Sequence, residues 1–340
     1  MLTLDYSNKI IIDYLTITFK APSFQTFLMD LLKIPNNDNV ISTRNRNFDQ
    51  GIYFMGVRIM WNSESGLVML ECSGQGCRTV ESLNPEFSWS RFLLTFSEWL
   101  TTKNDEGHYI AHISRIDLAY DIFDNDDVTF DRIVKYVKKR QWACLSGKTD
   151  IRMPTDKFGL EYTEKCIYFG SEKSDRFLRI YDKALEQGVL DHKWLRIEMQ
   201  NRNDNALSVV LNLIKYDFDV GYVYKGILRD YLRFLTKSRD SVDSKHIADI
   251  PTCRWWLDLL SHVGKIKQLY LPGIEYNAGT LYKYIEKQVS SSLKTFVSLS
   301  AGDISNLIDI IENAKMNFKQ RQLLETERLK DKLVYPDLIE

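Results

Sequence analysis

The spacing of apolar residues changes its period near residue 205. Before that point, segments such as residues 10–19 (IIIDYLTITF) and 114–123 (SRIDLAYDIF) are rich in β-branched and aromatic residues, which is typical of strands. Beyond it, residues 206–215 and 224–237 carry apolar side chains at helical spacing. The chain therefore combines a strand-rich first part with a helical second part.

The expected elements of the first part follow the order strand, helix, strand, strand, helix, strand. This order fits an antiparallel sheet with helices on one face. We predict an α+β fold, with an antiparallel-sheet domain in residues 1–205 and a mostly helical domain in residues 206–340. Residues 51–61 are expected to form one strand, and residues 86–101 one helix.

The composition is that of an ordinary globular protein, with 44% hydrophobic residues. The 45 Lys and Arg residues against 46 Asp and Glu leave a net charge of −1, so composition alone gives no sign of a nucleic-acid binder. A basic surface would have to be local. The five cysteines are too sparse for a disulfide scaffold, and the absence of a CxxC pair argues against a structural zinc site.

The sequence predicts no membrane segment, because it contains no run of about 18 uncharged apolar residues. The first apolar stretch carries Asp5, Lys9 and Asp13, which a signal peptide would not. We therefore expect a cytoplasmic protein.

Three expected strands carry polar residues at alternate positions, where side chains share one face. The sets are Arg115, Asp117, Ala119 and Asp121; Phe177, Arg179, Tyr181 and Lys183; and Arg196, Glu198 and Gln200. If these strands are neighbours, one surface carries carboxylates, basic groups and a tyrosine. Carboxylates bind hard divalent cations, Arg and Lys hold phosphates, and tyrosine offers an oxygen nucleophile. These groups together are suited to attack on a phosphodiester.

A simpler reading pairs each carboxylate with an arginine. Glu198 beside Arg196 would then form a cross-strand ion pair, and Asp117 would be an ordinary strand residue. Asp117 and Asp121 lie about 13 Å apart along a regular strand, so they cannot share one ion unless the strand bulges or bends. Both readings stay open at this point.

Two further segments have unusual patterns. Residues 73–78 (SGQGCR) place two glycines after a strand, which either frees backbone N–H groups for a ligand or forms a hairpin or bulge. A second pattern is a stripe of basic residues at four-residue spacing on one expected helix face, made of Lys225, Arg229, Arg233 and Lys237. Like charges in this arrangement destabilise a helix unless an anion offsets them. The stripe is either a solvated face or a contact with DNA phosphates.

Four segments in order resemble the replication initiation factor family, which comprises rolling-circle initiators of small plasmids and filamentous phages and related relaxases of conjugative elements. The segments are SGQGCR (73–78), RIDLAYDIFD (115–124), YFGSEKSDRFLRIYDK (168–183) and WLRIEMQNR (194–202). The resemblance spans about residues 75–205.

The resemblance implies that residues 1–205 form a nicking domain, which cleaves one strand at an origin and rejoins it through a 5′-phosphotyrosyl intermediate. By position in RIYDK, the nucleophile is Tyr181, with Arg179 and Lys183 as its catalytic neighbours. The expected ligands of Mg²⁺ or Mn²⁺ are Asp117, Asp121, Glu198 and Glu71. The residues expected to contact DNA are Arg196, Lys225, Arg229, Arg233 and Lys237.

The implied partners are double- and single-stranded origin DNA, a host helicase and a second copy of the chain. Residues 206–340 would then bind DNA or dimerise. An alternative is a non-catalytic, sequence-specific DNA-binding regulator on the same scaffold. A topoisomerase or tyrosine recombinase needs a dispersed Arg/His set, which the five histidines do not supply.

Overall fold

The computed structural model describes residues 7–35, 40–42, 47–103, 109–189, 191–266, 268, 281–282, 285–316, 320–321 and 324. The chain divides into two compact units, residues 1–270 and 271–340. The strands are β1 (Lys9–Lys20), β2 (Ile41–Ser42), β3 (Gln50–Phe54), β4 (Val57–Trp61), β5 (Leu67–Cys72), β6 (Ala111–Phe123), β7 (Trp142–Cys144), β8 (Thr149–Arg152), β9 (Cys166–Phe169), β10 (Arg176–Asp182), β11 (Trp194–Arg202) and β12 (Leu232–Phe234).

Helices connect and follow these strands. They are α1 (Phe24–Leu32), α2 (Gly74–Leu83), α3 (Trp89–Thr95), α4 (Ser97–Thr101), α5 (Phe130–Lys138), α6 (Lys183–Gln187), α7 (Asn203–Lys215), α8 (Val220–Tyr231), α9 (Arg254–Leu259), α11 (Ser290–Leu299) and α12 (Ser305–Glu312), with 3-10 turns η1 (Arg239–Ser241) and η2 (Ser244–Asp249) and the π turn η3 (Ile285–Val289). Within the described part of the chain, no helix is both long enough and apolar enough to cross a bilayer.

Ten strands form one sheet in the order β2-β3-β4-β5-β1-β6-β11-β10-β9-β8, and each pair of neighbours is antiparallel. The expected antiparallel α+β fold is therefore confirmed. The central strands β1 and β6 join two halves of similar order. In each half the first strand is followed by a helix, α1 or α5, and the last strand returns to pair with the first.

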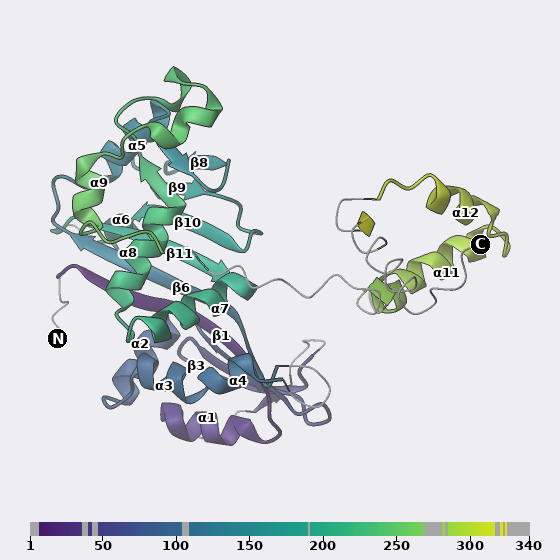
Figure 1. Cartoon of the computed structure of the whole chain (residues 1–340). Coiled ribbons are helices and arrows are strands. Elements are labelled where there is room, and N and C mark those ends of the chain that lie inside the picture. The colour runs from purple at the N-terminus through teal and green to yellow at the C-terminus, as the bar shows by residue number, and fades with distance from the viewer. Residues whose placement is uncertain are drawn as a thin grey trace, which may run out of the picture. The chain divides into compact units, whose positions relative to one another are not determined.

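The hydrophobic core lies on one face of this sheet. Residues at alternate positions, such as Leu15 and Ile17 in β1 and Ile197 in β11, are fully buried there with residues of the helices. Helices α2, α7 and α8 cross this same face (Figure 1). The other face carries the intervening polar positions of β4, β5, β6, β10 and β11, and we call it the polar face.

The compact unit that contains the sheet does not end at residue 205. Val209, Leu213, Tyr224 and Trp256 from α7, α8 and α9 are 0% exposed and belong to the sheet's core. Helices α7, α8 and α9 therefore complete the core instead of forming a domain of their own, and the unit extends to residue 270. The second unit, described in itself, contains η3, α11 and α12.

Local structure differs from expectation in two places. Residues 51–61 form a hairpin, because Met55 and Gly56 both adopt positive φ (42° and 86°) and turn the chain between β3 and β4. The expected helix over residues 86–101 is divided into α3 and α4 at Phe96.

Candidate active site

The register of the sheet brings three predicted strands together on the polar face. β11 lies between β6 and β10, with Glu198 opposite Arg179 on one side and Ala119 on the other. One step along, Arg196 lies opposite both Tyr181 and Asp121. The condition that these three strands are neighbours is therefore met.

Tyr181, Glu198 and Arg179 are linked directly. The Tyr181 hydroxyl donates a hydrogen bond to Glu198 Oε2 at 3.0 Å, and Arg179 Nη2 pairs with Glu198 Oε1. The side chains of Glu198 and Arg179 are 4% and 40% exposed, so the guanidinium is the solvent-facing member of the pair. This arrangement places a carboxylate beside the phenol and a cation at the pocket surface.

Burial raises the pKa of Tyr181 well above its ordinary value, and the negative charge of Glu198 raises it further. The phenol therefore stays protonated at neutral pH. A phenol in this state needs a proton acceptor to act as a nucleophile, and Glu198 already accepts its hydrogen bond.

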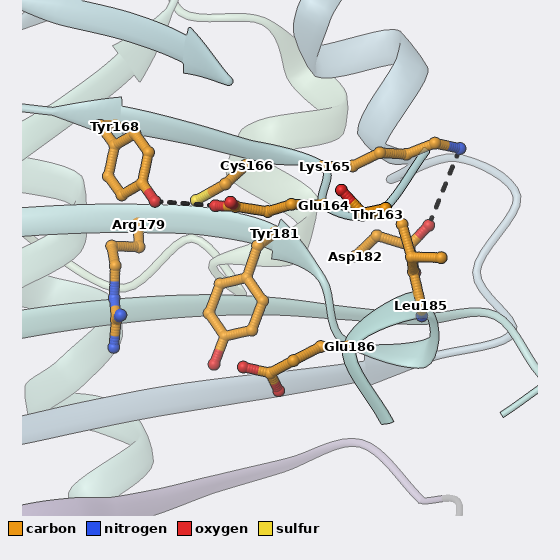
Figure 2. Close-up of a pocket in the computed structure, with 10 residues that line it drawn as sticks. All are labelled: Thr163, Glu164, Lys165, Cys166, Tyr168, Arg179, Tyr181, Asp182, Leu185 and Glu186. Atoms are coloured by element: carbon orange, nitrogen blue, oxygen red, sulfur yellow. Dashed lines mark hydrogen bonds and ion pairs between the residues drawn. The ribbon is translucent and has the colours of Figure 1, made fainter. Parts of the chain in front are cut away.

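A pocket of about 330 Å³ opens beside Tyr181 (Figure 2). Its lining residues are Thr163, Glu164, Lys165, Cys166, Tyr168, Arg179, Tyr181, Asp182, Leu185 and Glu186. The carboxylate of Glu186 points toward the Tyr181 phenol, and Lys183 at the start of α6 pairs with Glu186. Lys183 Nζ lies 5.5 Å from the centre of the Tyr181 ring. Tyr181 and its two predicted neighbours, Arg179 and Lys183, therefore lie together.

Asp117 lies next to this group on β6. Arg115 forms a forked pair with it, from Nε to Oδ1 at 3.0 Å and from Nη2 to Oδ2 at 2.5 Å. Burial raises the pKa of Asp117 to about 6 despite Arg115, and the nearby charge of Glu198 adds to the rise. Asp117 and Glu198 lie on adjacent strands and are oxygen donors of the kind that Mg²⁺ uses, so together they could hold a cation.

Asp121 and Arg196 have a different environment from the one expected. The Arg196 guanidinium donates to Asp121 Oδ1 at 2.6 Å, to Asp121 Oδ2 at 2.8 Å and to Asp13 Oδ2 at 3.0 Å. Trp194 Nε1 adds a bond to Asp121 Oδ1 at 2.7 Å. Asp121 is 0% and Arg196 7% exposed, so in this arrangement the two form a buried ion pair, whereas the expected roles were a metal ligand and a DNA contact.

Glu71 is also separated from the expected ligand set. It lies on β5 and pairs with Arg58 Nη1 at 3.1 Å. Strands β1 and β6 lie between β5 and β11, so Glu71 and Glu198 are about 14 Å apart across the sheet. Among the described residues, no three His, Cys, Asp or Glu side chains converge as a metal site. The four-carboxylate ligand set is therefore not assembled here.

The basic stripe does not lie on one helix face. Helix α8 ends at Tyr231, and Arg233 belongs to strand β12. Lys225 donates to Ser261 Oγ at 2.8 Å, Arg229 Nη1 to the His262 carbonyl at 3.1 Å, and Arg233 to the Ile247 carbonyl at 3.3 Å. These three residues hold the segments after β12 against α8, whereas Lys237 is exposed.

The glycines of residues 73–78 permit a close backbone approach. A Cβ on Gly76 would lie 2.2 Å from the Gly56 carbonyl oxygen, so α2 packs directly on the β3–β4 turn. Ser73 is the N-cap of α2 and accepts from Gly76 N at 3.4 Å. The segment is thus the start of a helix and neither a hairpin nor a bulge.

Asp13 and Arg115 are site residues that the sequence reasoning missed as such. Asp13 lies at a bulge in β1, and burial raises its pKa although Arg196 opposes the rise. The available signal was a single carboxylate inside an otherwise apolar strand, residues 10–19. Arg115 shared the face of Asp117 in the strand alternation, but nothing local indicated that the two would pair.

Known proteins resemble this chain over most of its length. Residues 111–311 match the family described as replication initiation factor, and residues 9–95 match the N-terminal domain of rolling circle replication initiation proteins. A relative from Bacillus subtilis strain 168, named as the DNA relaxase NicK, is 23% identical over 333 residues, covering 92% of this chain and 88% of its own.

A solved structure shares the fold. The rolling circle replication initiator protein from Geobacillus stearothermophilus matches with a TM-score of 0.62 at 24% identity, covering 77% of this chain and 99% of that chain. These matches confirm the resemblance drawn from the four sequence segments. Because residues 111–311 make up more than half of the chain, the protein belongs to the replication initiation factor family.

Proposed function

We propose that the protein nicks one DNA strand at a replication origin through Tyr181 and later rejoins it. The observation that carries this proposal is the hydrogen bond from the Tyr181 hydroxyl to Glu198, beside a pocket that Arg179 also lines. A phenol that could attack, a carboxylate that could accept its proton and a guanidinium that could bind a phosphate therefore lie together, with the phenol and the guanidinium lining that pocket.

In the nicking step, the Tyr181 oxygen attacks phosphorus and its proton passes to Glu198. The new bond joins phosphorus to the tyrosine oxygen, and the bond from phosphorus to the 3′ oxygen breaks. The 3′ oxygen takes a proton from water and leaves as a hydroxyl, while the 5′ phosphate stays on the protein. Attack by a 3′ hydroxyl on the same ester reverses the step and rejoins the strand without ATP.

Arg179 and Lys183 supply positive charge to this reaction. The Arg179 guanidinium carbon lies 5.6 Å from the centre of the Tyr181 ring, comparable to the 5.5 Å of Lys183. Charge gathers on the phosphate oxygens as the tyrosine attacks, so two cations beside Tyr181 would stabilise that state more than the starting one. Arg179, as the more exposed member of its pair, is the better placed to turn toward a phosphate.

Asp117 and Glu198 would hold a divalent cation, Mg²⁺ or Mn²⁺, in this proposal. Mg²⁺ is commonly bound by one or two carboxylates together with substrate phosphates, so two carboxylates on adjacent strands suffice. The cation would neutralise the phosphate and stabilise developing charge. Asp121 and Glu71 are not part of this revised ligand pair.

The proposal includes the partners that the resemblance implied. These are the origin as duplex and as single strand, a host helicase, and a second copy of the chain that would supply another tyrosine. The site of action is the cytoplasm. The helices after residue 205 would contribute to DNA binding or dimerisation.

Tyr181→Phe tests the nucleophile. We expect this variant to bind origin DNA as the wild type does and to lose nicking of a supercoiled origin plasmid, because the ring still packs but the attacking oxygen is gone. Tyr168→Phe, in the same pocket, is the matched control and should nick normally. Nicking by Tyr181→Phe at the wild-type rate would move the nucleophile to Tyr168, Tyr162 or Tyr120. A wild-type protein that binds but never nicks would favour the non-catalytic regulator.

Glu198→Gln and Asp117→Asn test the cation. We expect both variants to lose metal-dependent nicking and to bind Mn²⁺ at least tenfold more weakly by calorimetry, because each removes a charged ligand. Glu71→Gln should leave the Mn²⁺ affinity unchanged, because strands β1 and β6 lie between Glu71 on β5 and Glu198 on β11. Nicking that persists in a chelator, or equal Mn²⁺ affinity in all three variants, would show that these carboxylates only form ion pairs.

A further inference from the structure

The two halves of the sheet repeat one row of side chains. In the second half, Tyr168 of β9 lies opposite Arg179 of β10, which lies opposite Glu198 of β11. In the first half, Tyr53 of β3 lies opposite Arg58 of β4, which lies opposite Glu71 of β5. The last strand of each row then pairs with the first strand of its half, β6 or β1. The two rows therefore occupy equivalent places in the two halves.

The contacts within the rows are also alike. Arg58 pairs with Glu71 at 3.1 Å, as Arg179 pairs with Glu198. The Arg58 guanidinium lies 5.9 Å from the centre of the Tyr53 ring, within the range of a cation–π contact. Each row thus holds an arginine between a tyrosine and a glutamate.

The rows differ in the groups that the chemistry needs. The positions equivalent to Tyr181, Arg196 and Asp121 hold Met60, Met69 and Thr18. Methionine and threonine at these positions give no tyrosine nucleophile and no buried ion pair behind it. The first row therefore keeps an aromatic ring and a guanidinium but lacks the means to cleave.

The first row is open to a ligand. Tyr53, a large aromatic residue on a sheet, is nevertheless 59% exposed. The Arg58 side chain is 44% exposed. Aromatic rings that stack on bases, combined with basic groups that follow the backbone, are the components of single-strand binding surfaces.

Further arginine–aromatic pairs connect the two rows across the polar face. Arg115 of β6 lies 3.9 Å from the centre of the Tyr14 ring on β1, between the halves. Arg152 of β8 lies 4.5 Å from the Tyr168 ring at the far side. Because such pairs recur from β8 to β4, the first row is continuous with the candidate active site.

We propose that the first row, Tyr53 and Arg58, binds the single strand that extends from the nick site, with a base stacked on Tyr53 and a phosphate on Arg58. This inference rests on the proposed function for the identity of its ligand. Five strand spacings separate β10 from β4, or about 24 Å. Only an oligonucleotide that extends well beyond the nick reaches the row.

The test measures binding in a Tyr181→Phe background, so that cleavage does not interfere. An oligonucleotide of about 30 nucleotides reaches about 50 Å to each side of the nick even at the duplex rise of about 3.4 Å per nucleotide, whereas one of about 6 nucleotides reaches about 10 Å at that rise and falls short of the row even when stretched to about twice that length. Tyr53→Ala should weaken binding of the longer one by about fivefold or more and leave the shorter one unchanged. Arg58→Gln should reduce the slope of log affinity against log salt by about 0.7 for the longer one.

Phe27→Ala in α1 and Arg91→Gln in α3 are matched controls, since both residues are exposed on helices of the same half. Neither should change either affinity. Unchanged binding of the longer oligonucleotide by both row variants, or equal losses in the controls, would overturn the inference. Because nicking is not measured, the result is independent of whether Tyr181 is the nucleophile.

Discussion

Among the residues that the structure describes, each buried carboxylate on the polar face has an arginine partner, and one of them, Glu198, also accepts a hydrogen bond from a tyrosine. Asp117 pairs with Arg115, and Asp121 with Arg196. A charge taken from water needs such a partner, so these pairs alone do not identify a site. Glu198 differs because it holds Arg179 and accepts from Tyr181 as well. That additional hydrogen bond distinguishes Glu198, the candidate catalytic carboxylate, from Asp117 and Asp121.

Asp117 predicts a measurable dependence of stability on pH. Its pKa rises from 3.8 to about 6 on folding, so between these values the folded protein binds more protons than the unfolded chain. Stability from this group is complete below about pH 4 and is lost as the pH rises through about 6. Relative to Asp117→Asn, the wild type should lose about 3 kcal/mol of unfolding free energy across that range.

Denaturant unfolding of the two proteins at a series of pH values measures this difference. Above about pH 7 the difference should be constant, because Asp117 is then ionised in both states. A difference that stays constant from about pH 4 to 7 would mean that Asp117 ionises at its ordinary pKa and is better solvated than the structure indicates.

At the scale of elements, periodicity predicted the long strands, and the sharp turns and packing partners were missed. Residues 10–19 and 114–123 alternate clearly because one face is buried, and they became β1 and β6. The β3–β4 turn depends on a positive φ at Met55, which no local pattern requires. Residues 224–237 kept helical spacing past Tyr231, but pairing with β7 made Leu232–Phe234 a strand. Tertiary pairing overrode local preference there.

The same limit explains which residues of the candidate site could be predicted from the sequence. The strand faces could be read from alternation, so Tyr181, Arg179 and Glu198 were found. Their partners depend on the order of strands in the sheet, which alternation does not specify. Arg196 shared a face with Glu198 along β11, but it turned to Asp121 on the next strand.

The basic residues of α8 and β12 give a prediction about DNA binding. Arg229 and Arg233 donate hydrogen bonds to the backbone carbonyls of residues 262 and 247. We therefore expect the double variant Arg229→Gln, Arg233→Gln to have lower thermal stability. The slope of log affinity for origin duplex against log salt should stay unchanged. Phosphate contacts at both residues would instead flatten the slope by about 1.8. Affinity measured across a salt series decides between the two, and Lys237→Gln is the exposed comparison.

The larger unit of the molecule, residues 1–270, is a sheet of two similar halves whose core is completed by helices α7, α8 and α9. The polar face carries the candidate site in one half and the proposed single-strand row in the other. The core on the helix-covered face includes residues of α7, α8 and α9. Hydrogen bonds add to this packing: Tyr224 of α8 donates to the Ile197 carbonyl of β11 at 2.6 Å, and Trp256 of α9 donates to the Leu232 carbonyl at 3.1 Å. Position in the sequence alone did not reveal this dependence.

Truncation tests that dependence directly. A chain of residues 1–270 should unfold cooperatively, whereas residues 1–205 alone should not fold. The shorter chain loses Val209, Leu213, Tyr224 and Trp256, which are all 0% exposed. Four fully buried side chains of this kind contribute about 6–12 kcal/mol, comparable to the total stability of a typical domain. Circular dichroism during thermal unfolding measures both chains. A cooperative transition in residues 1–205 would support the domain boundary expected at residue 205. It would also show that the later helices are not needed for the sheet to fold.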